Sequence, residues 1–203
     1  MNKSPASAQA AINPLAQLDA DREAARERSD PWAALCAVAT VTPTGEAEIR
    51  TLVLRHLNHH LALFFSATSP KWQDIKSTES IALLIYLPSI QVQYRVRSHW
   101  QAIPAELVHE HWQLRPSIPR QLDWFYQTQP QSSPIEDDEL AALIAEGDAP
   151  TQAPASAMGI YLYPFDIERL QLSSGIHARH HYQRSGDAPG ALDAMWHRQT
   201  LIP

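Results

Sequence analysis

The sequence predicts a mainly β protein with helices. The architecture that fits best is a small closed or split β-barrel with two or three helices around it. After residue 34 the chain is a series of short runs rich in β-branched and aliphatic residues, separated by turn residues. Regular crossover helices do not separate these runs, so a parallel α/β sheet is the poorer interpretation. A chain of 203 residues with 44% hydrophobic residues is long enough for one substantial core.

The N-terminal region is expected to be a loose, polar tail over residues 1–13, followed by a solvated helix. Apolar residues recur there at helical spacing among many charges, and Asp30-Pro31 is a stop signal. We therefore expect residues 1–29 to form a tail and helix, and residues 30–203 to form one domain.

The first three runs that follow are expected to pair as an antiparallel meander, since only short turns connect them. The last part of the chain should contribute two or three further strands. The expected strands are 34–41, 48–57, 61–67, 81–88, 91–103, 158–165, 166–173 and 177–184.

Helices are expected where start signals precede apolar residues. Ser69 is a good N-cap with Pro70 at the first helical position, and Pro104 favours a second helix start. The stretch 117–154 is rich in proline, glutamine and acids, so we expect it to be irregular apart from one helix. The expected helices are 69–80, 104–116 and 136–147.

Composition excludes several classes of function. The net charge is −6 with pI about 5.9, and the basic residues are scattered, which argues against nucleic acid as a partner. No apolar run approaches the length of a membrane span, and the N-terminus lacks a signal core, so a soluble cytoplasmic protein is expected. Cys36 is the only cysteine and lies in an apolar run, where a small buried hydrophobe is its expected role.

Anion-binding groups recur along the stretch from Ile49 to Ile75, which includes the second and third runs and the helix start that follows. Arg50, Arg55 and Lys71 are basic, and hydroxyls cluster nearby at Ser66 and Ser69. Neither GxGxxG nor GxxxxGK[ST] is present, so a phosphate would have to be held by side chains and a helix start. The alternative is that these are rim charges of a barrel, with their stems packed on apolar surface.

The ten histidines raise a metal hypothesis, above all in HLNHH and HARHH. Neither cluster matches HExxH or adjoins a cysteine or an acid, so no metal site is predicted. A serine hydrolase is also disfavoured because no GxSxG occurs.

An ordered set of motifs resembles the pyridoxamine 5′-phosphate oxidase family. The motifs are RTLVLR, FFS followed by SPKWQDI, QVQYRVR, RP at 115–116, QS at 131–132 and HARHHYQR. The resemblance runs from about Asp30 to the C-terminus, and the order of the pieces makes it specific. It implies an FMN-binding split barrel that works as a homodimer, with FMN at the subunit interface and a small-molecule substrate.

The resemblance also assigns residues to FMN. A strand and a helix start grip its phosphate and ribityl chain, a glutamine lies near the flavin ring, a QS pair reaches across from the partner subunit, and a late arginine contacts the flavin. The corresponding residues are Arg50, Thr51, Leu52, Val53, Arg55, Ser66, Ser69, Lys71, Gln93, Gln131, Ser132 and Arg179.

Most departures from the family pattern lie at the positions that hold the substrate in the family. The tyrosine, arginine and serine that hold the substrate phosphate correspond here to His111, Arg115 and Pro119, and the R-x-H pair above the flavin corresponds to Gly175 and His177. The tentative substrate residues are therefore His111, Arg115 and His177. The positions that hold FMN in the family differ less. Pro70 stands in place of an arginine, Arg55 in place of a lysine and Leu170 in place of the tryptophan that stacks on the flavin.

Three functions follow from this pattern. The first is an FMN-dependent oxidoreductase on an unidentified substrate. The second is a pyridoxamine or pyridoxine 5′-phosphate oxidase proper, and the third is a non-enzymatic flavin-binding protein. The loss of the phosphate-holding residues favours the first.

Overall fold

The computed structural model describes residues 13–127, 129, 131, 133–145, 150–172, 175, 177–185 and 195–203. Its strands are β1 (Leu35–Val41), β2 (Ala47–Val53), β3 (Arg55–Leu57), β4 (His60–Ser66), β5 (Ser80–Leu87), β6 (Val92–Ala102), β7 (Ala157–Gln171), β8 (Ala178–Arg184) and β9 (Trp196–Leu201). Its helices are α1 (Pro14–Glu27), α2 (Pro70–Lys76), α3 (Ala105–Gln113), α4 (Ser117–Phe125) and α5 (Asp137–Ala145), with short 3₁₀ turns η1 (Pro31–Ala34) and η2 (Pro88–Ile90). No helix in the described part of the chain has the length and apolar character of a membrane span.

The prediction of a mainly β protein with helices is confirmed. The strands belong to one sheet in the order β2-β1-β5-β6-β7-β4-β3, with β8 beside β7 and β9 beside β8. The pairs β3 with β4, β4 with β7, β7 with β8 and β8 with β9 are all antiparallel. β5 shows the strict alternation of exposed and buried residues that a strand with one buried face requires.

The expected three-stranded meander is only partly correct: β1 pairs with β2 and β3 pairs with β4, but the second run is not one continuous strand. The second run breaks at Leu54 into β2 and β3, which stand at opposite ends of the strand order. Leu54 and Leu57 are both buried although they are three residues apart, a spacing that one regular strand cannot place on one face. The break separates Arg50 on β2 from Arg55 on β3.

Two further expectations need correction. The stretch 117–154 contains the helix α4 in addition to the expected α5, because Pro119 falls in the first turn of α4, where a backbone N–H has no intrahelical partner. The two strands expected over 158–173 form the single strand β7, and β9 was not expected. The helices α2 and α3 lie where the sequence predicts them.

The chain divides into two compact units, each built from several segments. Unit 1 comprises residues 1–37, 82–98 and 163–203, and unit 2 comprises residues 38–81 and 99–162. The division at residue 29 into a tail with helix and one domain stays a prediction.

In unit 1, α1 is less solvated than expected. Leu18 and Ala25 are fully buried, and Arg22 is 1% exposed with its Nε donating to the Ala33 carbonyl at 2.9 Å. Burial lowers the pKa of Arg22, with the nearby charge of Arg26 adding to the effect. Cys36 is buried as predicted, and that burial raises its pKa to about 12, so the thiol is an inert part of the core.

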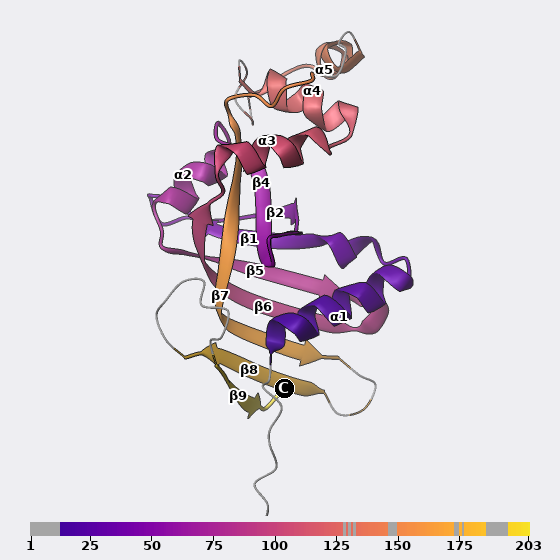
Figure 1. Cartoon of the computed structure of the whole chain (residues 1–203), viewed down its shortest axis with the longest axis vertical. Helices are drawn as coiled ribbons and strands as arrows, with labels where there is room; N and C mark the ends of the chain where they lie inside the picture. The colour runs from indigo at the N-terminus through magenta and orange to yellow at the C-terminus, as the bar shows by residue number, and fades with distance from the viewer. Residues whose placement is uncertain are drawn as a thin grey trace, which may run out of the picture. The chain divides into compact units, whose positions relative to one another are not determined.

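α1 lies across the strands of unit 1 (Figure 1), and a partly buried polar junction fixes it there. The Asp21 carboxylate accepts a hydrogen bond from the Tyr94 hydroxyl on β6 at 2.6 Å and from Arg169 Nε on β7 at 2.8 Å. Burial, followed by the bond and charge of Asp21, raises the pKa of Tyr94, so the phenol keeps its proton. Because Asp21 accepts bonds from two strands and Arg169 Nε also donates to the Tyr94 hydroxyl at 3.1 Å, the junction orients α1 as well as holding it.

The centre of unit 2 lies between β4, the first half of β7 and the helix α3. β4 and β7 pair from Leu61 opposite Leu162 to Ser66 opposite Ala157. α3 buries Val108 and Trp112, and α2 buries Ile75. The residues that the sequence assigns to an anion and to a substrate phosphate lie around this core.

Candidate functional site

Arg50 on β2 belongs to a partly buried polar cluster. Its guanidinium donates a short hydrogen bond to Thr40 Oγ1 on β1 and lies 3.5 Å from Asp74 Oδ2 on α2. The Thr40 hydroxyl donates in turn to Asp74 Oδ2 at 2.9 Å. Asp74 is 5% exposed, and a carboxylate so buried requires such partners. Thr40 and Asp74 therefore hold Arg50 in one orientation, and Asp74 offsets part of its charge.

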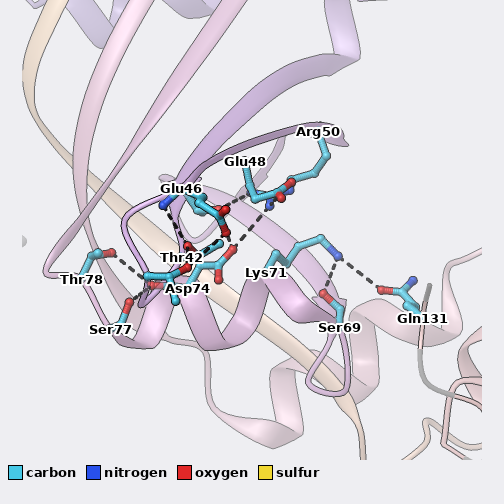
Figure 2. A network of polar contacts seen from close by, with 12 residues as sticks. Thr42, Glu46, Glu48, Arg50, Ser69, Lys71, Asp74, Ser77, Thr78 and Gln131 are labelled. Carbon is cyan, nitrogen blue, oxygen red and sulfur yellow. Dashed lines mark hydrogen bonds and ion pairs between the residues drawn. The ribbon is translucent and has the colours of Figure 1, made fainter. Parts of the chain in front are cut away.

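Lys71, the second residue of α2, lies beside the Arg50 cluster (Figure 2). Its ammonium donates to Ser69 Oγ at 2.6 Å and to Gln131 Oε1 at 3.3 Å, and stands 5.9 Å from the centre of the Phe65 ring. Burial lowers the pKa of Lys71, and the positive charge of Arg50 lowers it further. Burial and the charge of Arg50 thus both disfavour the charged form of Lys71, and a bound anion would relieve both effects.

The predicted hydroxyls have different surroundings. Ser69 is 1% exposed and occupies the N-cap position of α2 as expected, but its side chain makes no capping bond and accepts from Lys71 instead. Ser66 Oγ lies 2.7 Å from Thr68 Oγ1, whose hydroxyl donates to the Tyr126 carbonyl at 3.0 Å. Ser69 is therefore part of the cation cluster, whereas Ser66 orders the turn between β4 and α2.

A cavity of about 220 Å³ lies within unit 2. Thr51, Leu52 and Val53 of β2 line it, as does Arg55 of β3, so four of the predicted FMN residues share this space. Its apolar wall is completed by residues of β4, β7 and α3, among them Phe64, Met158 and Val108. His111 and Arg115, two of the predicted substrate residues, line the same cavity.

An aromatic stack forms part of the cavity wall. The rings of Phe64 and His111 are 5.6 Å apart between centres and inclined by 25°. Phe64 on β4 stands opposite Gly159 on β7, and the absence of a side chain at Gly159 leaves room for its ring. The stack therefore depends on a glycine in the neighbouring strand.

Replacing Gly159 with alanine is expected to lower the free energy of unfolding by about 1–3 kcal/mol, the cost of overpacking a filled core. A Cβ at this position would lie 2.9 Å from Ile103 Cδ1 and 3.0 Å from two ring carbons of Phe64, so a side chain has to move. Urea unfolding measures the change. Gly175→Ala is the matched control, because nothing lies within 4 Å of its added Cβ. Equal stabilities of the two variants would contradict the tight packing at Gly159.

Arg115 is paired with an acid that the sequence analysis did not identify. Its guanidinium donates to Asp123 Oδ2 on α4 at 2.6 Å, and Trp112 Nε1 donates to the same oxygen at 2.7 Å. Burial raises the pKa of Asp123, while the charge and hydrogen bonds of Arg115 and the bond from Trp112 oppose that rise. The carboxylate form is the one that accepts both bonds, so the charge of Arg115 is largely compensated from behind the cavity.

Three predicted residues lie in unit 1. Gln93 is half-buried on β6, His177 is exposed just before β8, and Arg179 on β8 donates to Glu168 Oε2 at 2.8 Å. Ser132 lies outside the described residues. Within the described residues, no group of three or more histidine, cysteine or acidic side chains is placed to hold a metal ion.

Sequence reasoning missed the two acids that set the charge of the site. In the sequence, Asp74 is only a favourable residue in the first turns of a helix, and Asp123 lies in a stretch expected to be irregular. A helical spacing of three between Lys71 and Asp74 was the one available signal, and it placed them on one face of α2. Nothing in the sequence indicated that Asp123 would face Arg115.

Solved structures identify the fold. PhzG from Burkholderia lata, solved with tetrahydrophenazine-1-carboxylic acid, matches with a TM-score of 0.80 at 20% identity, covering 100% of this chain and 98% of that one. A protein of Nostoc punctiforme described as pyridoxamine 5′-phosphate oxidase-related and FMN-binding matches with a TM-score of 0.73 at 18% identity over 100% of both chains. The predicted split-barrel fold is thus confirmed.

Sequence relatives identify the family. No family model matches the chain. The pyridoxine/pyridoxamine 5′-phosphate oxidase of Sinorhizobium fredii is 30% identical over 151 residues, 70% of each protein. That of Pseudomonas savastanoi pv. phaseolicola is 29% identical over 174 residues, 82% of this chain and 76% of that protein. The chain belongs to the pyridoxine/pyridoxamine 5′-phosphate oxidase-like family.

Proposed function

We propose that the protein is an FMN-dependent oxidoreductase whose substrate differs from pyridoxine 5′-phosphate. The observation that carries the proposal is the pair of cations, Arg50 and Lys71, held together beside Ser69 in a partly buried polar cluster. The chain lacks a glycine-rich phosphate loop, so a side-chain cluster of this kind is what a terminal phosphate requires.

The donor set suits FMN better than FAD. Arginine provides a fork of N–H donors, lysine a point charge and serine a hydroxyl, which together match the oxygens of one phosphate monoester. No dinucleotide fingerprint accompanies them. Arg50, Ser69 and Lys71 would hold the phosphate, and Thr51 to Val53 would lie along the rest of the cofactor. When bound, the flavin supplies the redox chemistry.

The cavity provides the place for a substrate. Its wall is mostly apolar, which limits the access of water to the reacting groups, while His111 and Arg115 supply polar groups to orient a substrate. The protein therefore binds, orients and desolvates the substrate. We assign no residue to proton transfer.

The absorbance spectrum of the purified protein tests the cofactor. Bands at roughly 370 and 450 nm report a flavin, and chromatography of the heat-released cofactor distinguishes FMN from FAD. We expect FMN, either carried through purification or taken up with a stoichiometry of one per chain. Isolation with FAD, or protein that stays colourless after incubation with FMN, would refute the proposal.

Pyridoxine or pyridoxamine 5′-phosphate oxidase activity is the second candidate. It is favoured by the names of the sequence relatives and by the presence of His111 and Arg115 in one cavity. A flavin-binding protein without turnover is the third. Assays with oxygen or an artificial acceptor, on FMN-loaded protein, separate a turning-over enzyme from a binder.

We further propose that the working form is a cytoplasmic homodimer. In unit 1, β5 exposes Leu84 and Tyr86, each 38% accessible, and in unit 2, β2 exposes Ile49 and Val53. Apolar residues exposed along strands are the kind of surface that a partner subunit covers.

Sedimentation is expected to give twice the chain mass of 22.8 kDa. Tyr86→Glu should weaken the dimer because it places a charge on the face proposed to be covered. Leu114→Glu is the control, an equally drastic change at an apolar residue that is 78% exposed near the end of α3. A monomer that retains FMN would overturn the dimer proposal.

A further inference from the structure

Thr40 is a polar residue on the buried face of β1. It is 5% exposed, and Cys36 and Val38, which precede it on the same face, are almost fully buried. Valine has nearly the same shape as threonine and could occupy such a position without removing a hydroxyl from water. The hydroxyl of Thr40 therefore destabilises the core unless its hydrogen bonds offset the loss of hydration.

Those hydrogen bonds run from Arg50 through Thr40 to Asp74. Thr40 Oγ1 donates to Asp74 Oδ2 at 2.9 Å, so its one proton is committed and its lone pairs are turned toward a donor. The Arg50 guanidinium supplies that donor through NH1, while its NH2 lies 3.5 Å from Asp74 Oδ2. Asp74 thus fixes the direction of the hydroxyl, and the hydroxyl fixes the guanidinium.

Glu48 offers Arg50 a different position. It precedes Arg50 by two residues on β2, and its Oε2 lies 4.0 Å from Arg50 NH2 (Figure 2). The Glu48 side chain is 56% exposed, so a guanidinium drawn toward it would move toward solvent. Exposed ion pairs of this kind contribute little, whereas the buried hydroxyl and carboxylate hold the guanidinium on the inner side. Thr40 and Asp74 therefore decide which position Arg50 takes.

The position of Arg50 matters because a phosphate is bound by several donors at once. Burial and then the charge of Arg50 lower the pKa of Lys71, so Arg50 acts on the second cation of the proposed phosphate site. A guanidinium has five N–H donors, so the bond to Thr40 and the ion pair with Asp74 leave donors for phosphate oxygens. A side chain already held in place also loses less rotamer freedom when the ligand binds.

We propose that Thr40 is a positioning residue of the FMN phosphate site: its hydroxyl, oriented by Asp74, holds the Arg50 guanidinium in the position that binds phosphate. The inference rests on the proposed function, since the phosphate is that of FMN. Thr40 acts through Arg50 and requires no contact with the cofactor. Its effect should therefore appear with FMN and not with riboflavin, which has the same ring system and ribityl chain but no phosphate.

Thr40→Val tests the proposal, because it removes the hydroxyl without changing the net charge. Titration of the apoprotein with FMN and with riboflavin, followed by flavin fluorescence, gives both dissociation constants. We expect the unmodified protein to bind FMN at least about tenfold more tightly than riboflavin. Thr40→Val should weaken FMN binding about tenfold and riboflavin binding less than about twofold. Equal weakening of the two ligands would mean that Thr40 only supports the fold, and would overturn the inference.

Two further variants match Thr40→Val. Thr40→Ser keeps the hydroxyl and should bind FMN within about twofold of the unmodified protein. Thr42→Val is the control for the same substitution in the turn after β1, where the hydroxyl bonds to Thr44 Oγ1 at 2.8 Å and to the Glu46 N–H at 3.0 Å. It should leave the ratio of FMN to riboflavin affinity unchanged. If Thr40→Ser lost FMN affinity as Thr40→Val does, the hydroxyl would not be the cause.

A double-mutant cycle tests the dependence on Arg50. In Arg50→Ala protein, adding Thr40→Val should change FMN affinity by less than about twofold, because the residue through which Thr40 acts is gone. A further loss of about tenfold in that background would show that Thr40 acts independently of Arg50, contrary to the inference.

Failure of the proposed function and failure of this inference give different results. Unmodified protein that binds no FMN, or binds it no more tightly than riboflavin, would refute the phosphate site itself. Unmodified protein that prefers FMN, with an unchanged ratio of affinities in Thr40→Val, would overturn only the role of Thr40. Where Thr40→Val does not fold, Thr40→Ala removes the same hydroxyl and has the same expected ratio.

Discussion

Lys71→Ala and Arg50→Ala are each expected to weaken FMN binding by about 1.5–3 kcal/mol, the size of a charge-assisted hydrogen bond. That is roughly a ten- to 150-fold rise in the dissociation constant. Both changes remove a cation from the proposed phosphate site. Quenching of flavin fluorescence on titration of the apoprotein measures the effect.

The two variants are expected to differ in their effect on the stability of the fold. Arg50→Ala also removes a partner of the buried Asp74 carboxylate, so stability is expected to fall together with FMN affinity. Lys71→Ala removes an ammonium whose burial is unfavourable, so FMN affinity should fall with little loss of stability. Lys71 is therefore the cleaner test of the phosphate site.

Lys76→Ala is the matched control on the same helix. Lys76 is an exposed cation in the last turn of α2, with its ammonium 5.4 Å from the Trp72 ring centre. It should leave FMN affinity within about twofold, because screening weakens a distant surface charge. If Lys71→Ala and Arg50→Ala also left the affinity unchanged, the basic residues would be rim charges and the proposed phosphate site would be wrong.

Turnover of pyridoxine 5′-phosphate is expected to be poor or absent. Pro119 offers neither a hydroxyl nor a backbone N–H, and His111 is engaged in a stack with Phe64. Asp123 offsets the charge of Arg115, and Gly175 cannot supply the charge that the family places there. Two lost charge-assisted contacts would lower kcat/KM by roughly two to four orders of magnitude.

Steady-state oxidation of pyridoxine 5′-phosphate and pyridoxamine 5′-phosphate under oxygen measures this. The variant His111→Tyr with Pro119→Ser restores the family residues at two positions and should raise kcat/KM at least about tenfold if the phosphate contacts are what is missing. A kcat/KM of about 10⁴ M⁻¹s⁻¹ or more in the unmodified protein would prove the expectation wrong and favour the second candidate function.

Local signals predicted most of the secondary structure. Ser69 and Pro70 marked the start of α2, and alternation of apolar and polar residues marked β5. The errors came where local rules compete. Pro119 suggested an irregular segment, although proline in a first helical turn costs little, and Leu54 interrupted a run that resembled one strand.

The candidate site was predictable where the resemblance assigned a role to a residue. Arg50, Lys71, His111 and Arg115 were identified from motif and chemistry, because a resemblance preserves residue types in order. Their acidic partners were not, since the resemblance gave Asp74 no role within SPKWQDI and Asp123 belongs to no motif, and both gain their roles only from what they contact.

The amino-acid sequence by itself determined the mainly β fold with its helices, the membership of a family and the presence of basic residues suited to a phosphate. The tertiary structure alone decided how much charge each of those residues presents. Coulomb energy depends on distance and burial, and only folding brings Asp74 to 3.5 Å from Arg50 and Asp123 to 2.6 Å from Arg115. The sequence therefore cannot distinguish an arginine that presents its full charge to the site from one whose charge a neighbouring carboxylate already offsets.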